Sequence, residues 1–236
     1  MAADPSKPEA RTLVQQAYQC LREDILSGGL EPGSWLRIDA LRARYDIGPT
    51  PIREALSRLS SEGFVVSEEN RGFRIPPVTL EDLRDVTNQR KLVECAALRA
   101  AIERADEEFE SAVVAAYYRL SRVEERLAGK SPEVLAEWEQ RHREFHRALN
   151  LGANSPWLER FQELLYDQAD RYRRLYLPEA HVPPQVHEDH KRIMELVVAR
   201  KADEACALLA EHIERVYQIA SRASYFRKHA AAAAAE

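Results

Sequence analysis

The sequence has little glycine, few cysteines and no long hydrophobic run. Its 236 residues include 8 Gly and 3 Cys. No run of about 18 apolar residues is present, so we expect no membrane span. The start, MAADPSKPEA, lacks the apolar core of a signal peptide, which predicts a cytoplasmic protein. The cysteines, Cys20, Cys95 and Cys206, are odd in number and far apart, which favours buried thiols over a disulfide framework.

The charge balance excludes a protein that is basic over its whole surface. The net charge is −5, although 31% of the residues are charged. Between Arg37 and Arg58, however, five arginines stand against three acidic residues, a local excess of 5 − 3 = +2. Because nucleic-acid binding depends on the local patch, this segment can still contact DNA.

The segment 36–74 has the layout of a winged helix-turn-helix. The pattern of apolar residues and breaks predicts helices over 12–27, 39–45 and about 51–62, and strands over 64–66 and 73–75. Asp46-Ile47-Gly48-Pro49 is the break between the second and third helices. Thr50 is the expected N-cap of the third helix, with Pro51 at its first position. The polar tip 68–72 joins the strands and forms the wing.

In a helix-turn-helix, the N-terminal residues of the second helix of the motif meet base edges in the major groove. Arg53 can contact a guanine edge or a phosphate, and Thr50 and the free N–H groups beside it suit a phosphate. A single arginine is more often a solvated surface charge, so the combination of helix, turn, helix and wing carries the prediction. The expected DNA-contacting residues are Arg37, Thr50, Pro51, Arg53, Ser57, Arg58, Arg71 and Gly72.

Pro76-Pro77 marks the expected boundary between two domains. We predict a DNA-binding domain over 12–77 and an all-helical second domain over 78–226. Residues 1–11 are expected to be disordered, and 227–236 to be a low-complexity tail. The predicted helices of the second domain cover about 80–104, 106–128, 131–151, 155–176, 185–200 and 203–226. The fold class is therefore mainly α.

Four histidines of the second domain are the candidate metal ligands. His142 and His146 share one helix face, and His190 and His212 lie on two other helices among apolar residues. One such histidine alone is more often a hydrogen-bonded core residue. Four on inward faces favour a divalent metal site, with zinc or nickel as the ion. His187, three residues before His190, is a competing ligand.

Three arginines are the candidate effector-binding residues: Arg90, Arg171 and Arg173. A buried arginine requires an anion, which could be a carboxylate ligand or, for Arg90, simply Glu94 one turn later. A metal-dependent hydrolase with an accessory helical domain is the alternative function. HREFH resembles the HExxH motif of zinc proteases, but Glu144 follows the first histidine by two residues rather than one.

Several segments together resemble one family of regulators. TPIREALSRLSSEGFV, followed by RGFR, resembles the DNA-binding domain of GntR-type bacterial regulators. NQRKLVECAALRAA, RHREFHRALN, HEDHKRI and AEHIERV resemble the effector domain of the FadR subfamily, called FCD. The resemblance implies a homodimeric repressor of a palindromic operator. It also implies a bundle of six or seven helices around a metal-linked carboxylate pocket.

The sequence departs from the family pattern at two places. His146, His190 and His212 match the three family histidine ligands, but His142 stands where the family usually has Asp. Gly48-Pro49-Thr50-Pro51 replaces a common Ser-Arg-Thr-Pro, which removes one expected arginine contact to DNA. EWEQRHREFH and ADRYRRLY also resemble a subgroup of carbon-starvation regulators that respond to glutarate. The implied effector is glutarate or another small carboxylate.

Overall fold

The computed structural model describes residues 12–69, 71–127, 131–176, 184–223 and 226. The chain divides into two compact units, Met1–Val78 and Thr79–Glu236, and the division falls next to Pro76-Pro77. The expected disordered start, 1–11, and low-complexity tail, 227–236, lie outside the described residues.

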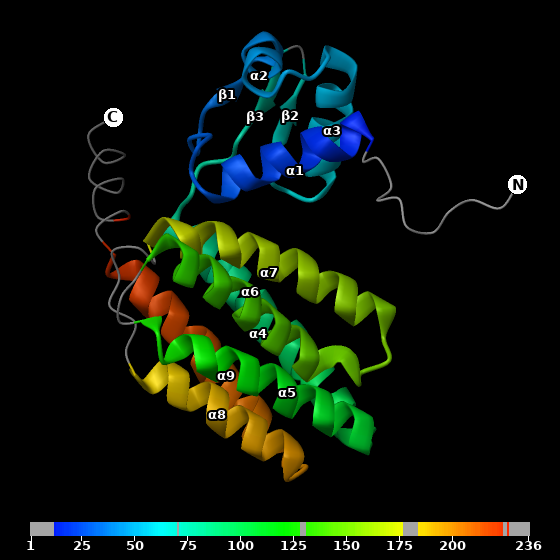
Figure 1. Cartoon of the computed structure of the whole chain (residues 1–236), viewed down its shortest axis with the longest axis vertical. Helices are drawn as coiled ribbons and strands as arrows, with labels where there is room; N and C mark the ends of the chain where they lie inside the picture. The colour runs from blue at the N-terminus through cyan, green and yellow to red at the C-terminus, as the bar shows by residue number, and fades with distance from the viewer. Residues whose placement is uncertain (1–11, 70, 128–130, 177–183, 224–225, 227–236) are drawn as a thin grey trace, which may run out of the picture. The chain divides into compact units, whose positions relative to one another are not determined.

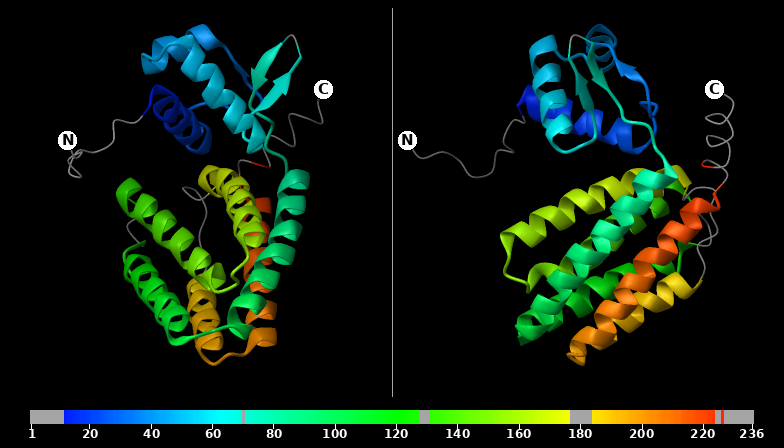
Figure 2. Two further views of the ribbon diagram at one scale, coloured as in Figure 1. Left: turned by 90° about the vertical axis from the view of Figure 1, so that its right-hand side faces the viewer. Right: turned by 180° about the vertical axis from the view of Figure 1, so that it is seen from behind.

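The first unit is a winged helix-turn-helix (Figures 1 and 2). Its helices are α1 (Leu13–Leu26), α2 (Ile38–Tyr45) and α3 (Pro49–Ser61), and its strands are β1 (Trp35–Leu36), β2 (Val66–Glu68) and β3 (Gly72–Arg74). The strands form an antiparallel sheet in the order β1-β3-β2. The buried stripes of α1 and α3 include Leu21, Ile52 and Leu56, which explains why these helices pack on each other.

The predicted helix and strand boundaries need three corrections. Helix α3 begins at Pro49 with Gly48 as its N-cap, so Thr50 is not the cap and Pro51 is not the first helical residue. Proline is tolerated there because the first helical N–H groups have no intrahelical partner. The first wing strand is β2 (Val66–Glu68) rather than 64–66, because Phe64 and Val65 are buried in the hydrophobic core. Strand β1 was not predicted, since two residues show no alternation.

The second unit is a bundle of helices, as the sequence predicts. Its described helices are α4 (Leu80–Glu103), α5 (Glu107–Glu124), α6 (Pro132–Leu151), α7 (Pro156–Tyr176), α8 (Pro184–Val198) and α9 (Ala202–Ser221). Thr79, Asp106 and Ser131 cap three of them, because each side chain accepts a hydrogen bond from the N–H three residues later. None of the helices in the described parts of the chain has the length and apolarity that a membrane crossing requires.

Helix α4 occupies a central position in the bundle, in contact with α6, α7 and α9, while α5 packs on α6 and α8 (Figure 1). The helices approach closely where α6 ends. A Cβ atom on Gly152 would lie only 3.0 Å from the Phe109 ring and 3.2 Å from Ala101. Glycine at this position therefore lets the end of α6 pack directly on α4 and α5.

Candidate functional site

The structure brings all four predicted histidine ligands together. His142 and His146 come from α6, His190 from α8 and His212 from α9, and all four side chains are buried. One possible ligand atom from each ring lies within 4.8 Å of the corresponding atoms of the others. The four rings therefore share one site inside the bundle.

Each ring has an oxygen partner near its Nδ1 atom. The pairs are His142 with Tyr166 at 2.5 Å, His146 with Glu94 at 3.4 Å, His190 with Glu124 at 2.8 Å and His212 with Asp189 at 3.4 Å. The Nε2 atoms of His146, His190 and His212 have no hydrogen-bond partner among the described residues. An oxygen at Nδ1 orients an imidazole and leaves its Nε2 lone pair available, which is the usual arrangement of a metal-binding histidine.

The surroundings favour neutral imidazoles and charged carboxylates. Burial lowers the pKa of His146 to about 4 and that of His212 to about 3. Burial also lowers the pKa of His142 well below its ordinary value. For Glu94, burial acts to raise the pKa, but Arg90 and His146 outweigh it and bring the value to about 2. At neutral pH these rings are therefore in the form that binds metal ions.

The residues fit a divalent transition metal. Three buried Nε2 atoms lack a partner, and the donor set of neutral imidazole nitrogens suits zinc or nickel better than calcium or magnesium. His187, the competing ligand, lies at the margin: it is 28% exposed, and its Nδ1 is 2.8 Å from the same Glu124 oxygen that His190 contacts. Glu124, His187 and His190 form a second possible ligand group that shares His190 with the first.

Two of the three predicted effector arginines lie beside this cluster. Arg90 Nε is 2.6 Å from Glu94 Oε1, both side chains are buried, and the guanidinium lies over the Tyr166 ring. Arg173 is buried, bonds Asp170 and lies over the rings of Tyr166 and Trp138. Glu94, which the sequence suggested as an internal partner for Arg90, therefore does pair with it.

Arg171 is placed differently. It is buried, but its guanidinium donates to Gln168, and it is close enough to Tyr172 to affect the pKa of that phenol. The Tyr172 hydroxyl in turn donates to Asp82 at the start of α4. Arg90 and Arg173, in contrast, both lie over the ring of Tyr166, the partner of His142.

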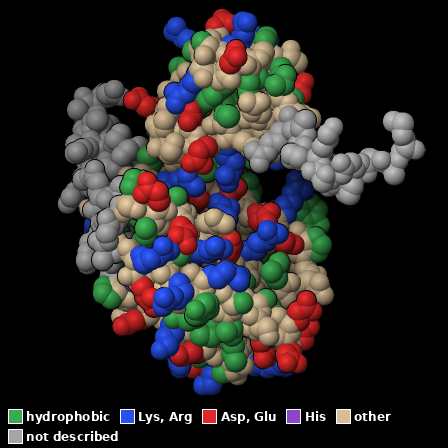
Figure 3. Space-filling view, viewed as in Figure 1, with side chains coloured by type: hydrophobic (Ala, Val, Ile, Leu, Met, Phe, Trp, Pro, Cys, Tyr) green, Lys and Arg blue, Asp and Glu red, His purple; other side chains and the backbone are tan. Residues whose placement is uncertain are grey.

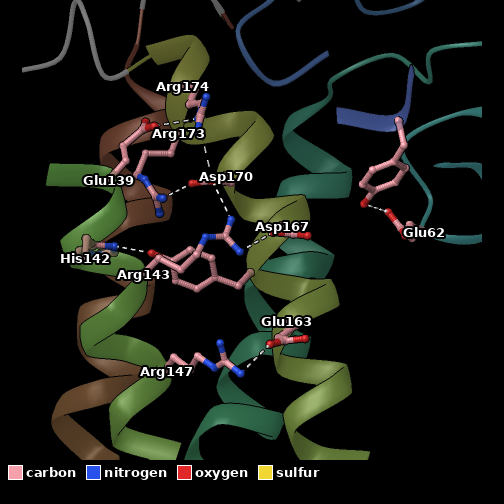
Figure 4. A network of polar contacts seen from close by, with 12 residues as sticks. Glu62, Glu139, His142, Arg143, Arg147, Glu163, Asp167, Asp170, Arg173 and Arg174 are labelled. Carbon is pink, nitrogen blue, oxygen red and sulfur yellow. Dashed lines mark hydrogen bonds and ion pairs between the residues drawn. The ribbon is translucent and has the colours of Figure 1, made fainter. Parts of the chain in front are cut away.

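A network of ion pairs between α6 and α7 was missed by the sequence analysis (Figure 4). Arg143 lies 2.5 Å from Asp167 and 2.9 Å from Asp170, and its guanidinium stacks over Tyr166, the partner of His142. A small pocket beside it is lined by Arg143, Arg147, Gln162, Glu163 and Tyr166. Basic and acidic side chains alternate over this face of the unit (Figure 3). Arg143 follows His142 directly, but nothing in the sequence pairs it with α7.

Three predicted DNA-contacting residues share the exposed side of α3. Thr50, Arg53 and Ser57 are exposed, while Ile52 and Leu56 between them are buried; Pro51 is half-buried. Arg37, before α2, is exposed as well. These exposed residues start at the N-terminal end of α3, which is the end that was expected to enter the major groove.

Arg58 is held by the protein itself. Its Nε is 3.2 Å from Glu62 Oε1 and its guanidinium carbon lies 3.8 Å from the centre of the Tyr18 ring. Tyr18 also donates its hydroxyl hydrogen to Glu62, at 2.6 Å. This arrangement ties α3 to α1 and gives Arg58 a structural role.

The wing presents the other two predicted contacts. Arg71 is 73% exposed, with Glu68 at 3.7 Å. Gly72 has φ +95°, a conformation that L side chains rarely adopt, so glycine fits the start of β3.

Comparison with known proteins settles what this architecture is. Residues 13–75 match the family described as "Bacterial regulatory proteins, gntR family", and residues 85–215 match the FCD domain. The chain belongs to the GntR family. It is 39% identical over 204 residues to the HTH-type transcriptional regulator BphR of Paraburkholderia xenovorans (strain LB400), covering 86% of this chain and 83% of BphR. It is 32% identical over 200 residues to the HTH-type transcriptional repressor GlaR of Escherichia coli (strain K12), covering 83% and 90%.

Solved structures of GntR-family regulators share the fold. E. coli McbR/YncC aligns with a TM-score of 0.68 at 22% identity over 88% of this chain and 98% of that one. A GntR regulator from Rhodococcus sp. RHA1 aligns with a TM-score of 0.69 at 23% identity over 89% and 98%. The predicted winged helix-turn-helix and helical FCD unit are thus confirmed.

The GntR-family protein is a transcriptional regulator and not an enzyme, so the hydrolase alternative is set aside. The BphR and GlaR relatives are both transcriptional regulators. The site agrees, because Glu144 of HREFH, the residue that would act as the base, pairs instead with Arg141 at 2.8 Å.

Proposed function

We propose that this GntR-family protein is a repressor whose operator binding is controlled by a small carboxylate bound at the histidine cluster. The relative GlaR carries the name of a repressor. The observation that carries the proposal is the set of three buried Nε2 atoms without a hydrogen-bond partner among the described residues. Leaving such groups unpaired costs folding free energy, so a site that keeps them is best explained by a ligand.

His142, His146, His190 and His212 would hold a divalent metal ion, with zinc or nickel as the favoured species. When bound, the ion supplies a Lewis-acidic site for one carboxylate group. Arg90 and Arg173 add buried positive charge nearby, which favours an anionic effector over a neutral one. The resemblance noted above makes glutarate or a similar small carboxylate the effector class to test first.

On the DNA side, α3 would enter the major groove of a palindromic operator in the cytoplasm. Arg53 would contact a base edge, Thr50 a phosphate and Arg71 of the wing the adjacent backbone. A homodimer would supply two such helices, one for each half-site. Because the net charge of the chain is negative, attraction to DNA must come from these local residues.

Effector binding would act by shifting populations between DNA-competent and DNA-incompetent arrangements. Helix α4 is suited to transmit the change. It starts at Leu80, directly after the DNA-binding unit in the chain, and it carries both Arg90 and Glu94. A carboxylate that draws Arg90 away from Glu94 would therefore alter α4 itself.

The test is operator binding measured by fluorescence anisotropy, on a duplex selected by the protein from a random-sequence library. We expect a small dicarboxylate to weaken binding, and a chelator to abolish this response. The variant His146→Ala/His190→Ala should lose bound metal and the response, whereas His187→Ala, the matched control, should keep both. Full metal occupancy in the double variant, or a response that survives chelation, would refute the assignment.

A further inference from the structure

Two cysteines face each other across the contact between α4 and α9, away from the histidine cluster. Cys95 Sγ lies 3.4 Å from the main-chain oxygen of Cys206, and Cys206 Sγ lies 3.4 Å from the main-chain oxygen of Cys95. The contact is therefore reciprocal, and it requires the two helix backbones to approach closely at this level. Such closeness is the condition for a disulfide, which only cysteines with short Cα separations can form.

The surroundings activate one of the two thiols. The neighbouring Cys95 side chain and the nearby Arg99 guanidinium together outweigh burial and lower the pKa of the Cys206 thiol, whereas the pKa of the Cys95 thiol is raised. Arg99 is 2.7 Å from Asp203, and that ion pair joins the same two helices one turn away at the surface. Cys206 is buried and Cys95 is half-buried, so a small oxidant would have to approach the pair from the side of Cys95.

We propose that Cys95 and Cys206 are a dithiol that hydroperoxides oxidise to a disulfide bridging α4 and α9. The Cys206 thiolate attacks the terminal oxygen of the hydroperoxide and the O–O bond breaks, which gives a sulfenic acid; the departing alkoxide or hydroxide takes up the proton that the Cys206 thiol released and leaves as an alcohol or water. The Cys95 sulfur then attacks the sulfenic sulfur. The S–S bond forms, the S–O bond breaks, and the departing hydroxide leaves as water with the Cys95 proton. The two thiols supply the two electrons that reduce the peroxide.

The bridge would join the two helices that support the histidine cluster. Glu94, next to Cys95, contacts His146, and His212 lies on α9 less than two turns beyond Cys206. The proposal does not depend on the metal or the effector, since each thiol already contacts the main chain of the other cysteine. In a reducing compartment, disulfides are usually transient and redox-sensing, and a closely placed pair of thiols fits that use.

The test uses the full-length native protein, reduced and then freed of reductant. After addition of hydrogen peroxide and alkylation, we expect two of the three thiols to be protected and the chain to lose two hydrogen atoms in mass. Peptide mapping should join Cys95 to Cys206, and dithiothreitol should reverse the change. Cys20→Ser is the matched control and should still form the bridge. Cys95→Ser should instead leave a sulfenic acid on Cys206 that dimedone traps.

Three outcomes would overturn the proposal. The first is that Cys95 and Cys206 both remain open to alkylation at peroxide levels that oxidise a free peptide thiol. The second is a bridge that forms only after denaturant is added, which would make the pair inert core thiols. The third is a disulfide that maps to Cys20. A melting temperature that rises on oxidation of the wild type, and not of Cys206→Ser, would add an independent readout of a bridge in the folded protein.

Discussion

The two units of the chain bury different kinds of side chain. In the DNA-binding unit, the buried residues that the structure describes are hydrophobic, such as Leu21, Ile52 and Phe64. In the FCD unit, the described buried residues also include charged and polar ones, spread from Thr87 to His212. Because burial of a polar group is costly unless it is paired, a core of this second kind is seldom retained for stability alone. The DNA contacts proposed for the first unit lie on its surface, whereas the ligands proposed for the second lie inside it.

The largest effect should come from breaking the buried ion pair. Arg90→Ala leaves the Glu94 carboxylate without its guanidinium, where the two side chains are only 5% and 1% exposed. We expect the free energy of unfolding of the FCD unit to fall by about 3–5 kcal/mol, the usual result of removing one partner of a buried pair. Urea denaturation measures it. The exposed Arg53→Ala is the reference, with a change within about 0.5 kcal/mol. Equal losses of unfolding free energy in the two variants would show that the two units do not differ in this way.

For operator affinity the order of the two variants should be reversed, with the larger effect from the exposed Arg53. Arg53→Ala should weaken operator binding by about 1–3 kcal/mol, the value of one good arginine contact to a base, and leave metal content unchanged. Anisotropy titration of the selected duplex measures this. Arg58→Ala on the same helix is the matched control, because its guanidinium is held by Glu62 and Tyr18. Unchanged affinity in Arg53→Ala would show that α3 meets DNA elsewhere.

Metal affinity should depend on the residues that orient the rings. Glu124 accepts from His190 Nδ1 at 2.8 Å, so Glu124→Gln should weaken metal binding by roughly 10-fold, at the low end for such partners. A competition titration with a chromogenic chelator gives the change. The neighbouring Glu125→Gln is the control, since Glu125 pairs with Arg122 at the surface. If both variants bound metal like the wild type, Glu124 would have no orienting role.

The smallest effect should come from a helix cap. The Thr79 hydroxyl accepts from the Asp82 N–H at 3.1 Å at the start of α4. Thr79→Ala should lower the unfolding free energy of the FCD unit by about 1 kcal/mol, while Thr79→Ser should restore most of it. Thermal unfolding of the wild type, Thr79→Ala and Thr79→Ser measures this effect, and operator affinity is a second readout. The loss can then be compared with that of Arg90→Ala.

What the sequence could predict depends on how far apart the interacting residues lie. Caps and helix periodicity are local, so the predicted starts of the helices near residues 80, 106 and 131 agree with those of α4, α5 and α6. The four histidines were grouped because His142 and His146 share one helix face and His190 and His212 lie among apolar residues of two other helices. Their oxygen partners escaped prediction because Glu124 and His190 are 66 residues apart, and only the fold brings them together. Strand β1 was missed because it has only two residues and its partner strand β3 lies about half of the first unit away in the sequence.

The carboxylates beside the rings also determine the net charge around the histidine cluster. Glu94, Glu124 and Asp189 contribute three negative charges, and Arg90 and Arg215, which pair with Glu94 and Asp189, return two positive ones, so −3 + 2 = −1. With neutral imidazoles, a dication changes this sum to +1. One carboxylate group then restores electroneutrality, whereas a neutral or cationic molecule leaves the interior charged. The acids that hold the rings would thus also select the sign of the signal molecule.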